Sequence, residues 1–310
     1  MVANTDFEVT LAQREKLKAA ISLFGASGSG KTFTALLLAY GMMKEAYPDL
    51  SEEELWMKIG VIDTEHKRSL LYADNTVKGY KIGRFRFLEF NAPYSTERYH
   101  QAIELLKKKG CEVVVVDSLS HAWEGIGGIL DQQQDLGGRF QDWKTMKPII
   151  KKFIQSLTEN DVHIISTLRT KQEYQAERDD NDKLQIKKIG LKPIQKDDLE
   201  YEFMIVLRME QNHIGTPTKD NSNLLNENGE MIKPEHGSMI YQWLELGIDV
   251  KAKENAKKQG LIEQIRAITT SNPEAQKKVE EFEFKAKLKL QDFSIKLLDT
   301  ALTRLAELKN

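Results

Sequence analysis

The segment Gly25-Ala26-Ser27-Gly28-Ser29-Gly30-Lys31-Thr32 has the spacing G-x-x-x-x-G-K-T, which predicts a phosphate-binding loop. Glycines let the backbone turn so that successive N–H groups face a phosphate, and the helix that follows adds its dipole. We expect Lys31 to reach the β- and γ-phosphates of ATP and to act in catalysis, and the Thr32 hydroxyl to bind Mg²⁺. The predicted nucleotide-binding residues are Gly25, Ala26, Ser27, Gly28, Ser29, Gly30, Lys31, Thr32 and Phe33.

Two acidic residues stand where a nucleotide site needs carboxylates. Asp117 ends the run Val113-Val114-Val115-Val116, so we expect it to hold Mg²⁺ and its waters together with Thr32. Glu65 follows another apolar run, and we interpret it as the general base that activates water, the alternative being a solvated loop glutamate. The residue after Asp117 is Ser118, so the adjacent Asp-Glu pair typical of AAA+ ATPases and many helicases is absent.

Short apolar runs that alternate with helical patterns have to position these residues. The expected strands lie at 19–24, 58–62, 84–90, 111–116, 162–167 and 200–209, and the expected helices at 32–43, 96–109 and 146–159. This alternation predicts an α/β fold with a mainly parallel sheet flanked by helices. Ligands bind beyond the carboxyl ends of the strands in such sheets, where the glycine-rich loop, Glu65, Asp117 and Thr167 would meet.

The composition of the chain changes near residue 250. Strand-like runs cease, Asn272-Pro273 is a good helix start, and leucines recur at helical spacing up to Leu308. We predict an N-terminal segment at 1–18, a core at 19–247 and a small C-terminal helical appendage at 248–310. The apolar stripe of the last helix has to pack on the core, on another subunit or on a partner protein.

Charge and cysteine content limit the classes of function. The 310 residues carry a formal net charge of -2, so any nucleic-acid contact has to come from a local basic surface. Cys111 is the single cysteine, which excludes a disulfide framework and a multi-cysteine metal site. The first residues lack the apolar stretch of a secretory signal, and no run approaches the roughly 20 apolar residues of a membrane span. We therefore expect a soluble cytoplasmic protein without membrane contact.

The order of these motifs resembles the RecA superfamily: the glycine-rich loop, then Asp63-Thr64-Glu65-His66, then Asp117-Ser118, then a strand ending in Ser166-Thr167-Leu168-Arg169. The stretches REKLKAAISLFGASGSGKTFTALLLA and DSLSHAWEG, with the later FQDW, are similar to phage-type RecA-like nucleotide-binding proteins, some of which act as single-strand annealing recombination proteins. The resemblance spans residues 14–246. It implies a RecA-like P-loop NTPase core, Glu65 as the catalytic glutamate, Asp117 as the Mg²⁺ aspartate and, for a phage-encoded protein, the cytoplasm of a bacterial host cell.

The resemblance also implies sensor and subunit roles. Thr167 falls where RecA has a glutamine that senses the γ-phosphate, and the shorter threonine reaches less far. The predicted sensor residues are therefore Ser118, Thr167 and Arg169. The alternative for Arg169 is an ordinary surface arginine without a role in the site. RecA-like rings and filaments often complete the phosphate site with a basic residue of a neighbouring subunit. Lys219 is the residue we predict in that role, within a homo-oligomeric ring or filament.

RecA-like proteins place DNA-binding loops after the Asp117-type and the Thr167-type strands. The first region, 123–143, holds paired glycines with Arg139, Phe140 and Trp143, which suit base stacking and phosphate pairing unless the aromatics pack on the core. The second region, 170–198, is expected to be a mobile loop. Its positive charge gathers in the second half, where the predicted contacts to single-stranded DNA are Lys183, Lys187, Lys188 and Lys192. The alternative for these lysines is a solvated face.

These observations predict a DNA-stimulated, ATP-hydrolysing RecA-like protein that binds single-stranded DNA and supports phage-type homologous recombination or strand annealing. Two alternatives use the same core chemistry: an oligomeric helicase-like motor, and a nucleotide-switched scaffold that docks a partner protein through its C-terminal helices. A GTPase would need an Asn-Lys-x-Asp guanine reader, which Thr218-Lys219-Asp220 does not supply. A small-molecule kinase would leave Glu65 without a role.

Overall fold

The computed structural model describes residues 11–178, 184–195 and 199–306 of the chain. The chain divides into two compact units, a core of Leu17–Glu245 and a second unit that continues from Leu246 and includes the segment before Leu17. Each unit has a hydrophobic interior of its own. Among the helices of the described residues, none is long and apolar enough to cross a membrane.

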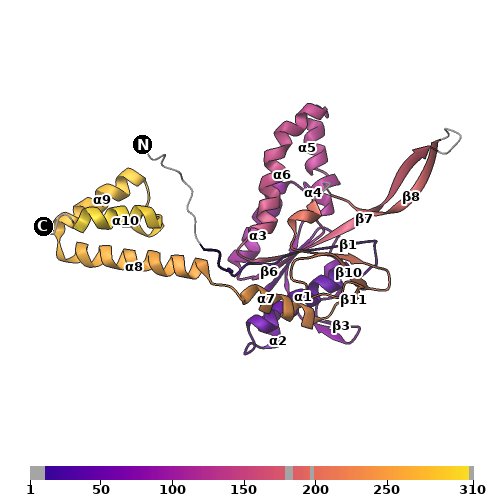
Figure 1. Cartoon of the computed structure of the whole chain (residues 1–310), viewed down its shortest axis with the longest axis horizontal. Helices are drawn as coiled ribbons and strands as arrows, with labels where there is room; N and C mark the ends of the chain where they lie inside the picture. The colour runs from indigo at the N-terminus through magenta and orange to yellow at the C-terminus, as the bar shows by residue number, and fades with distance from the viewer. Residues whose placement is uncertain (1–10, 179–183, 196–198, 307–310) are drawn as a thin grey trace. The chain divides into compact units, whose positions relative to one another are not determined.

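A nine-stranded sheet forms the centre of the core unit (Figure 1). Its order is β11-β10-β9-β1-β7-β6-β2-β5, and β8 pairs with β7. The strands from β9 to β5 are parallel to their neighbours, whereas β10, β11 and β8 pair antiparallel. The strands are β1 (Ala20–Gly25), β2 (Ile59–Asp63), β5 (Arg86–Glu89), β6 (Val113–Asp117), β7 (His163–Arg178), β8 (Leu184–Pro193), β9 (Ile205–Met209), β10 (Ile214–Asp220) and β11 (Glu230–Met231).

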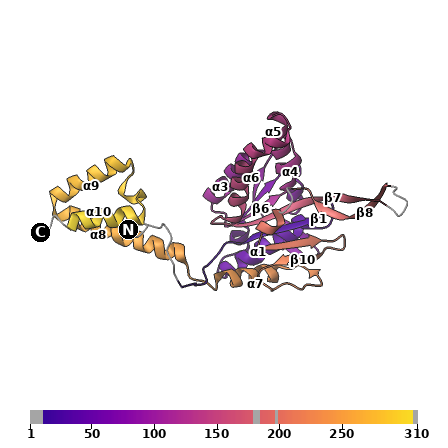
Figure 2. The same cartoon turned by 45° about the horizontal axis from the view of Figure 1, so that its top comes forward.

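Helices cover both faces of the sheet (Figures 1 and 2). One face carries α1 (Lys31–Ala46), α2 (Glu52–Met57) and α7 (Pro234–Glu245). The other carries α3 (Thr96–Lys108), α4 (Ser120–Glu124), α5 (Ile129–Asp135) and α6 (Trp143–Thr158). Both faces are covered, so the central strands are buried, and all five residues of β6, including Asp117 at its end, are buried.

The strand order brings the chemically active loops to one edge of the sheet. β7 lies between the strand that precedes the glycine-rich loop and the strand that ends in Asp117. Asp63 of β2 is the register partner of Asp117, and Leu23 of β1 is the partner of Thr167. The carboxyl ends of four parallel strands therefore meet at this edge. The predicted α/β class, with a mainly parallel sheet flanked by helices, is confirmed.

Much of the loop expected at 170–198 is instead strand, at 170–178 and 184–193, while 179–183 and 196–198 lie outside the described residues. β7 continues to Arg178 and pairs with β8 in a two-stranded antiparallel ribbon, with a bulge between Glu173 and Tyr174. The ribbon extends away from the rest of the core unit (Figures 1 and 2). In β8 the apolar residues Leu184 and Ile186 alternate with polar ones, and Ile189 and Leu191 repeat the spacing, but the two pairs are out of phase across the bulge. Backbone hydrogen bonds join the two strands.

Other element boundaries also differ from the sequence-based ones. The expected strand at 200–209 begins only at Ile205, because Leu199–Glu202 forms a 3-10 helix. The expected strand at 84–90 is the shorter β5, and a small hairpin of β3 (Asn75–Val77) and β4 (Tyr80–Ile82) precedes it. The first expected DNA loop, 123–143, is largely α5 and a 3-10 turn at Phe140–Asp142.

In the described part of the second unit the chain forms three α-helices, α8 (Val250–Ser271), α9 (Pro273–Ala286) and α10 (Ile295–Ala306), so the predicted C-terminal helices are confirmed. The Asn272 side chain accepts hydrogen bonds from the backbone N–H groups of Glu274 and Ala275, and Pro273 begins α9. Ile265, Leu298 and Leu305 are fully buried in the interior of this unit. Apolar packing between the helices therefore holds the unit together.

Candidate nucleotide site

The glycine-rich loop joins β1 to α1 in the way that its sequence predicts. Gly28 and Gly30 both have left-handed backbones, with φ of 83° and 85°. Lys31 begins α1, and its Nζ donates to the carbonyl oxygens of Gly25 and Ala26 at 2.8 Å each. Burial lowers the pKa of Lys31, an effect that the carboxylates of Asp117 and Glu65 oppose. The ammonium group therefore lies inside the curve of the loop.

Asp117 is buried between two threonine hydroxyl groups. Thr32 Oγ1 donates to Asp117 Oδ2 at 2.6 Å, and Thr167 Oγ1 donates to Asp117 Oδ1 at 2.5 Å. Burial raises the pKa of Asp117 in spite of these two hydrogen bonds. The threonine and the aspartate predicted to hold Mg²⁺ are thus adjacent, which suits an ion that combines one or two protein ligands with water and substrate phosphates.

Glu65 is held by an arginine from β7. Arg169 Nε donates to Glu65 Oε1 at 2.6 Å, a second guanidinium N–H donates to Oε2, and the Ser118 hydroxyl donates to Oε1 at 3.0 Å. The Glu65 side chain is only 9% exposed and that of Arg169 40%. Burial raises the pKa of Glu65, but the hydrogen bonds and charge of Arg169 outweigh it, so the pKa of this carboxyl lies below its usual value.

Hydrogen bonds from three elements fix the position of Glu65. The Asp63 carboxylate accepts from the backbone N–H groups of Glu65 and Ser69 at 2.7 and 2.9 Å, which closes the turn after β2. Thr64 Oγ1 accepts from the Ser118 N–H at 2.8 Å and lies 2.7 Å from His121 Nδ1. The carboxylate of Glu65 is therefore attached to β2, β6 and β7 at once.

A cavity of about 670 Å³ opens at this edge of the sheet. Its lining contains ten residues that the sequence predicts for nucleotide binding, catalysis or sensing: Ser27, Gly28, Gly30, Lys31, Thr32, Glu65, Asp117, Ser118, Thr167 and Arg169. Four further lining residues were missed from the sequence: Arg68, Leu71, Tyr72 and His213. The first three follow Glu65 closely in the chain, which is a usable signal, and His213 follows the end of β9, another strand of the same edge.

The remaining predicted loop residues do not line the cavity. Gly25 and Ala26 present their carbonyl oxygens to Lys31, and Ser29 is fully buried. Phe33 is buried in the core, where its ring stacks on Tyr72 with centroids 5.9 Å apart. Phe33 therefore packs against Tyr72, which lines the cavity.

The predicted DNA contacts lie on two elements. Phe140 is 93% exposed, and the neighbouring Arg139 is exposed as well, whereas Trp143 is half-buried and stacks on Trp123. Lys187, Lys188 and Lys192 belong to β8, and Lys183 lies outside the described residues. Lys219, on β10, donates from its ammonium group to the backbone carbonyl of Tyr201. The proposed subunit role of Lys219 would require it to exchange this partner.

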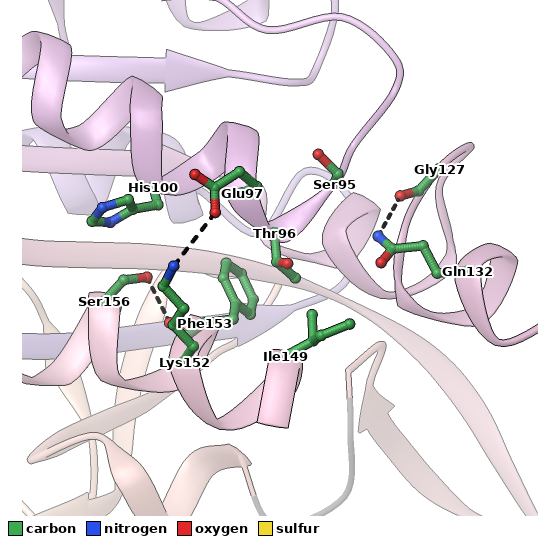
Figure 3. Close-up of a pocket in the computed structure, with 10 residues that line it drawn as sticks. All are labelled: Ser95, Thr96, Glu97, His100, Gly127, Gln132, Ile149, Lys152, Phe153 and Ser156. Carbon is green, nitrogen blue, oxygen red and sulfur yellow. Dashed lines mark hydrogen bonds and ion pairs between the residues drawn. The ribbon is translucent and has the colours of Figure 1, made fainter. Parts of the chain in front are cut away.

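A second cavity, of about 400 Å³, lies between α3 and α6 (Figure 3). The charges on its wall pair with each other, Lys152 with Glu97 at 3.7 Å, and Gln132 donates to the Gly127 carbonyl. Among the described residues no cluster of three or more His, Cys, Asp and Glu side chains has the geometry of a metal site. The cavity at the glycine-rich loop thus concentrates the groups that suit phosphate chemistry.

Comparison with known proteins identifies the family of this chain. The crystal structure of the RadB recombinase is similar at 16% sequence identity and a TM-score of 0.30, over 63% of this chain and 75% of that chain. No curated protein matches the sequence. A family described as AAA domain matches residues 17–241, which is more than half of the chain and includes every cavity residue named above. This chain therefore belongs to the AAA domain family of P-loop proteins.

Proposed function

We propose that this protein hydrolyses ATP, binds single-stranded DNA, and uses the two activities in strand annealing or homologous recombination. The observation that carries the proposal is the convergence of Lys31, Thr32, Asp117, Glu65 and Arg169 on one cavity beside a glycine-rich loop. These are the groups that cradle phosphates, hold Mg²⁺ and activate water in phosphoryl transfer. The further recombination role rests on the resemblance of the motifs to phage-type RecA-like proteins.

In the proposed hydrolysis, Glu65 accepts a proton from the attacking water. Lys31 exchanges its two loop carbonyl partners, which are neutral acceptors, for phosphate oxygens, which carry negative charge. Thr32 and Asp117 would hold Mg²⁺, which neutralises charge on the β- and γ-phosphates when bound. The backbone N–H groups around Gly28 and Gly30 orient the phosphate chain for in-line attack.

Arg169 would regulate this base. With both carboxylate oxygens engaged by the guanidinium, Glu65 has little capacity to accept the proton of water. A γ-phosphate is a competing anion for the same guanidinium, and Arg169 lines the cavity that would receive it. We therefore assign Arg169 a change of partner, from Glu65 to phosphate, that frees the base when ATP is bound.

The DNA-binding part of the proposal concerns the β7–β8 ribbon and the turn at Arg139 and Phe140. An aromatic ring that is 93% exposed next to an arginine suits base stacking with phosphate pairing. Arg169 stands at the root of the ribbon, since its N–H donates to Ser120 Oγ at 2.9 Å and its carbonyl accepts from Ile194 N–H at 2.8 Å. A ribbon that moves on DNA would therefore act directly on the residue that restrains Glu65.

The first experiment measures ATP turnover with and without a single-stranded oligonucleotide, with Lys31→Ala as the blank. We expect the oligonucleotide to stimulate ATP turnover by the wild-type chain, and we expect the Lys31→Ala variant to show no turnover. Glu65→Gln is expected to keep ATP binding and lose hydrolysis, since it retains the shape of the side chain without its basicity. Turnover that is indifferent to DNA would refute the coupling and favour a nucleotide-switched scaffold that docks a partner through α8–α10. Directional unwinding of duplex DNA would instead indicate a motor.

DNA binding is tested separately through salt dependence. Lys187→Gln combined with Lys188→Gln on β8 is expected to weaken oligonucleotide binding and to flatten the plot of log K against log salt by about 1–2. The matched control replaces the adjacent pair Lys277 and Lys278 on α9 with glutamine. Equal slopes for the two double variants would refute the ribbon as the DNA contact. A homo-oligomer that uses Lys219 between subunits is a further part of the proposal, tested by sedimentation of Lys219→Ala with ATP.

A further inference from the structure

The turn between β9 and β10 packs against the glycine-rich loop at two points. A Cβ atom on Gly25 would stand 2.4 Å from the carbonyl oxygen of Met209, the last residue of β9. A Cβ atom on Gly30 would stand 2.3 Å from Nδ1 of His213, which ends the turn. Distances this short leave room only for glycine at both positions. The loop that cradles phosphate therefore has the β9–β10 turn as its second wall.

The turn holds His213 in one place. Glu210 N–H donates to the Ile214 carbonyl and His213 N–H donates to the Glu210 carbonyl, each at 2.9 Å. The Ile214 N–H donates to the Asn212 side chain at 3.0 Å. His213 has a left-handed backbone with φ of 67°, a region in which asparagine, aspartate and histidine are enriched among non-glycine residues. The turn therefore admits an imidazole without requiring one, and asparagine would serve the turn equally well.

The imidazole has an unused hydrogen-bonding capacity at the cavity. His213 lines the same cavity as Lys31 and Thr32. Its Nδ1, covered by Gly30, is a buried atom without a hydrogen-bond partner among the described residues. In a neutral imidazole one ring nitrogen donates and the other accepts. Nε2 is then the nitrogen that can meet a ligand in the cavity.

We propose that His213 is a nucleotide-contacting residue, whose imidazole donates a hydrogen bond to the phosphate chain of a nucleotide held by the glycine-rich loop. The inference rests on the proposed ATPase function and extends it to a second wall of the site. The phosphate chain is the part in reach because the ring stands against Gly30, next to the lysine and threonine that bind phosphate and Mg²⁺. The contact would also attach the β9–β10 turn to bound nucleotide.

The test compares His213→Asn with the wild-type chain, because asparagine keeps the left-handed turn while its shorter side chain withdraws from the cavity. The binding of fluorescent N-methylanthraniloyl-ADP with Mg²⁺ is measured by titration, and thermal unfolding without nucleotide shows whether the fold is intact. We expect the Kd of the variant to be about 3–10-fold higher, because the complex loses one net hydrogen bond. The thermal unfolding of the nucleotide-free protein should be unchanged. His100→Asn, in the second cavity, is the matched histidine control and is expected to bind as the wild type does.

Competition by inorganic pyrophosphate identifies the group that is contacted. Pyrophosphate should lose the same factor in affinity for His213→Asn if the imidazole contacts the phosphate chain. Equal ADP affinity in the variant and the wild type would overturn the inference, and so would an unchanged affinity for pyrophosphate. A wild-type chain that does not bind ADP would overturn the proposed ATPase function itself, which distinguishes the two failures. If His213→Asn unfolds early, His213→Gly gives the same comparison, because glycine adopts the left-handed turn and has no side chain to reach the nucleotide.

Discussion

Replacing Asp117 with asparagine is expected to stabilise the core unit at neutral pH while it removes ATP turnover. The carboxylate is almost fully buried, and burial raises its pKa against the hydrogen bonds from Thr167 and Thr32, with the charges of Glu65 and Asp63 acting in the same direction as burial. A carboxyl whose pKa is raised on folding binds its proton more tightly in the folded chain. Its contribution is therefore most favourable at low pH and is lost as the pH rises through the folded pKa.

The size of the effect follows from opposing contributions. Each hydrogen bond from a threonine to the charged carboxylate contributes about 1.5–3 kcal/mol, whereas burial of the charge costs several kcal/mol. The raised pKa indicates that burial outweighs the hydrogen bonds. Asparagine keeps both threonines paired without the charge, so we expect a gain of about 1–2 kcal/mol at pH 7, as for other active-site residues that oppose stability. For a unit of this size the gain corresponds to a rise in Tm of about 2–8 °C.

The assay is urea or thermal unfolding in EDTA between pH 5 and pH 8, followed by circular dichroism. The gain should be largest at pH 7–8 and should shrink as the pH falls. Asp63→Asn is the control, and we expect it to lower the free energy of unfolding. The Asp63 carboxylate accepts hydrogen bonds from the N–H groups of Glu65, Lys67 and Ser69, and the amide of asparagine would turn a donor toward these donors. An Asp117→Asn chain that is less stable than the wild type at pH 7, or a gain that does not depend on pH, would refute the reasoning.

Three further predictions follow from other residues. Gly30→Ala places a side chain at φ 85° and against His213, so we expect a loss of about 1–3 kcal/mol in urea unfolding and weaker ADP binding. Arg169→Ala removes the charge that keeps the pKa of Glu65 low, so the acidic limb of the kcat/KM profile for ATP should move to higher pH; an unmoved limb contradicts Glu65 as the base. Leu298→Ala should destabilise α8–α10 by about 2–5 kcal/mol, measured by hydrogen exchange of those helices.

Much of the architecture was predictable because it depends on burial. The valine run of β6 and the apolar strand before the glycine-rich loop can only be central strands of a covered sheet. The neighbourhood of Lys31, Glu65 and Asp117 follows from a general property of parallel sheets, since residues that end such strands share one edge. The structure shows that these residues lie close together, but it does not test what each of them does in catalysis. The roles assigned to them therefore stay predictions.

What escaped prediction depends on pairing between distant segments. In the β7–β8 ribbon the apolar alternation of β8 changes phase at the bulge, and the pairing that defines the ribbon joins residues 170–178 to residues 184–193. The ion pair of Glu65 with Arg169 joins residues 104 positions apart, and only the fold brings their charges together. His213 was not assigned to the cavity for the same reason, since the space beside its ring is left by Gly30, which presents no side chain from which the contact can be inferred.

Placing the base on β2 rather than directly after Asp117 has a mechanical consequence. β6 lies between β2 and β7, so the pair of Glu65 and Arg169 spans the end of β6 and crosses Ser118, whose hydroxyl binds the same carboxylate. A glutamate at position 118 would instead follow the predicted Mg²⁺ aspartate directly, after the strand that pairs with β7. In the proposed mechanism, the bonds from Arg169 let β7 act on Glu65, and β7 continues without interruption into the ribbon. We therefore propose that hydrolysis depends on what the ribbon contacts.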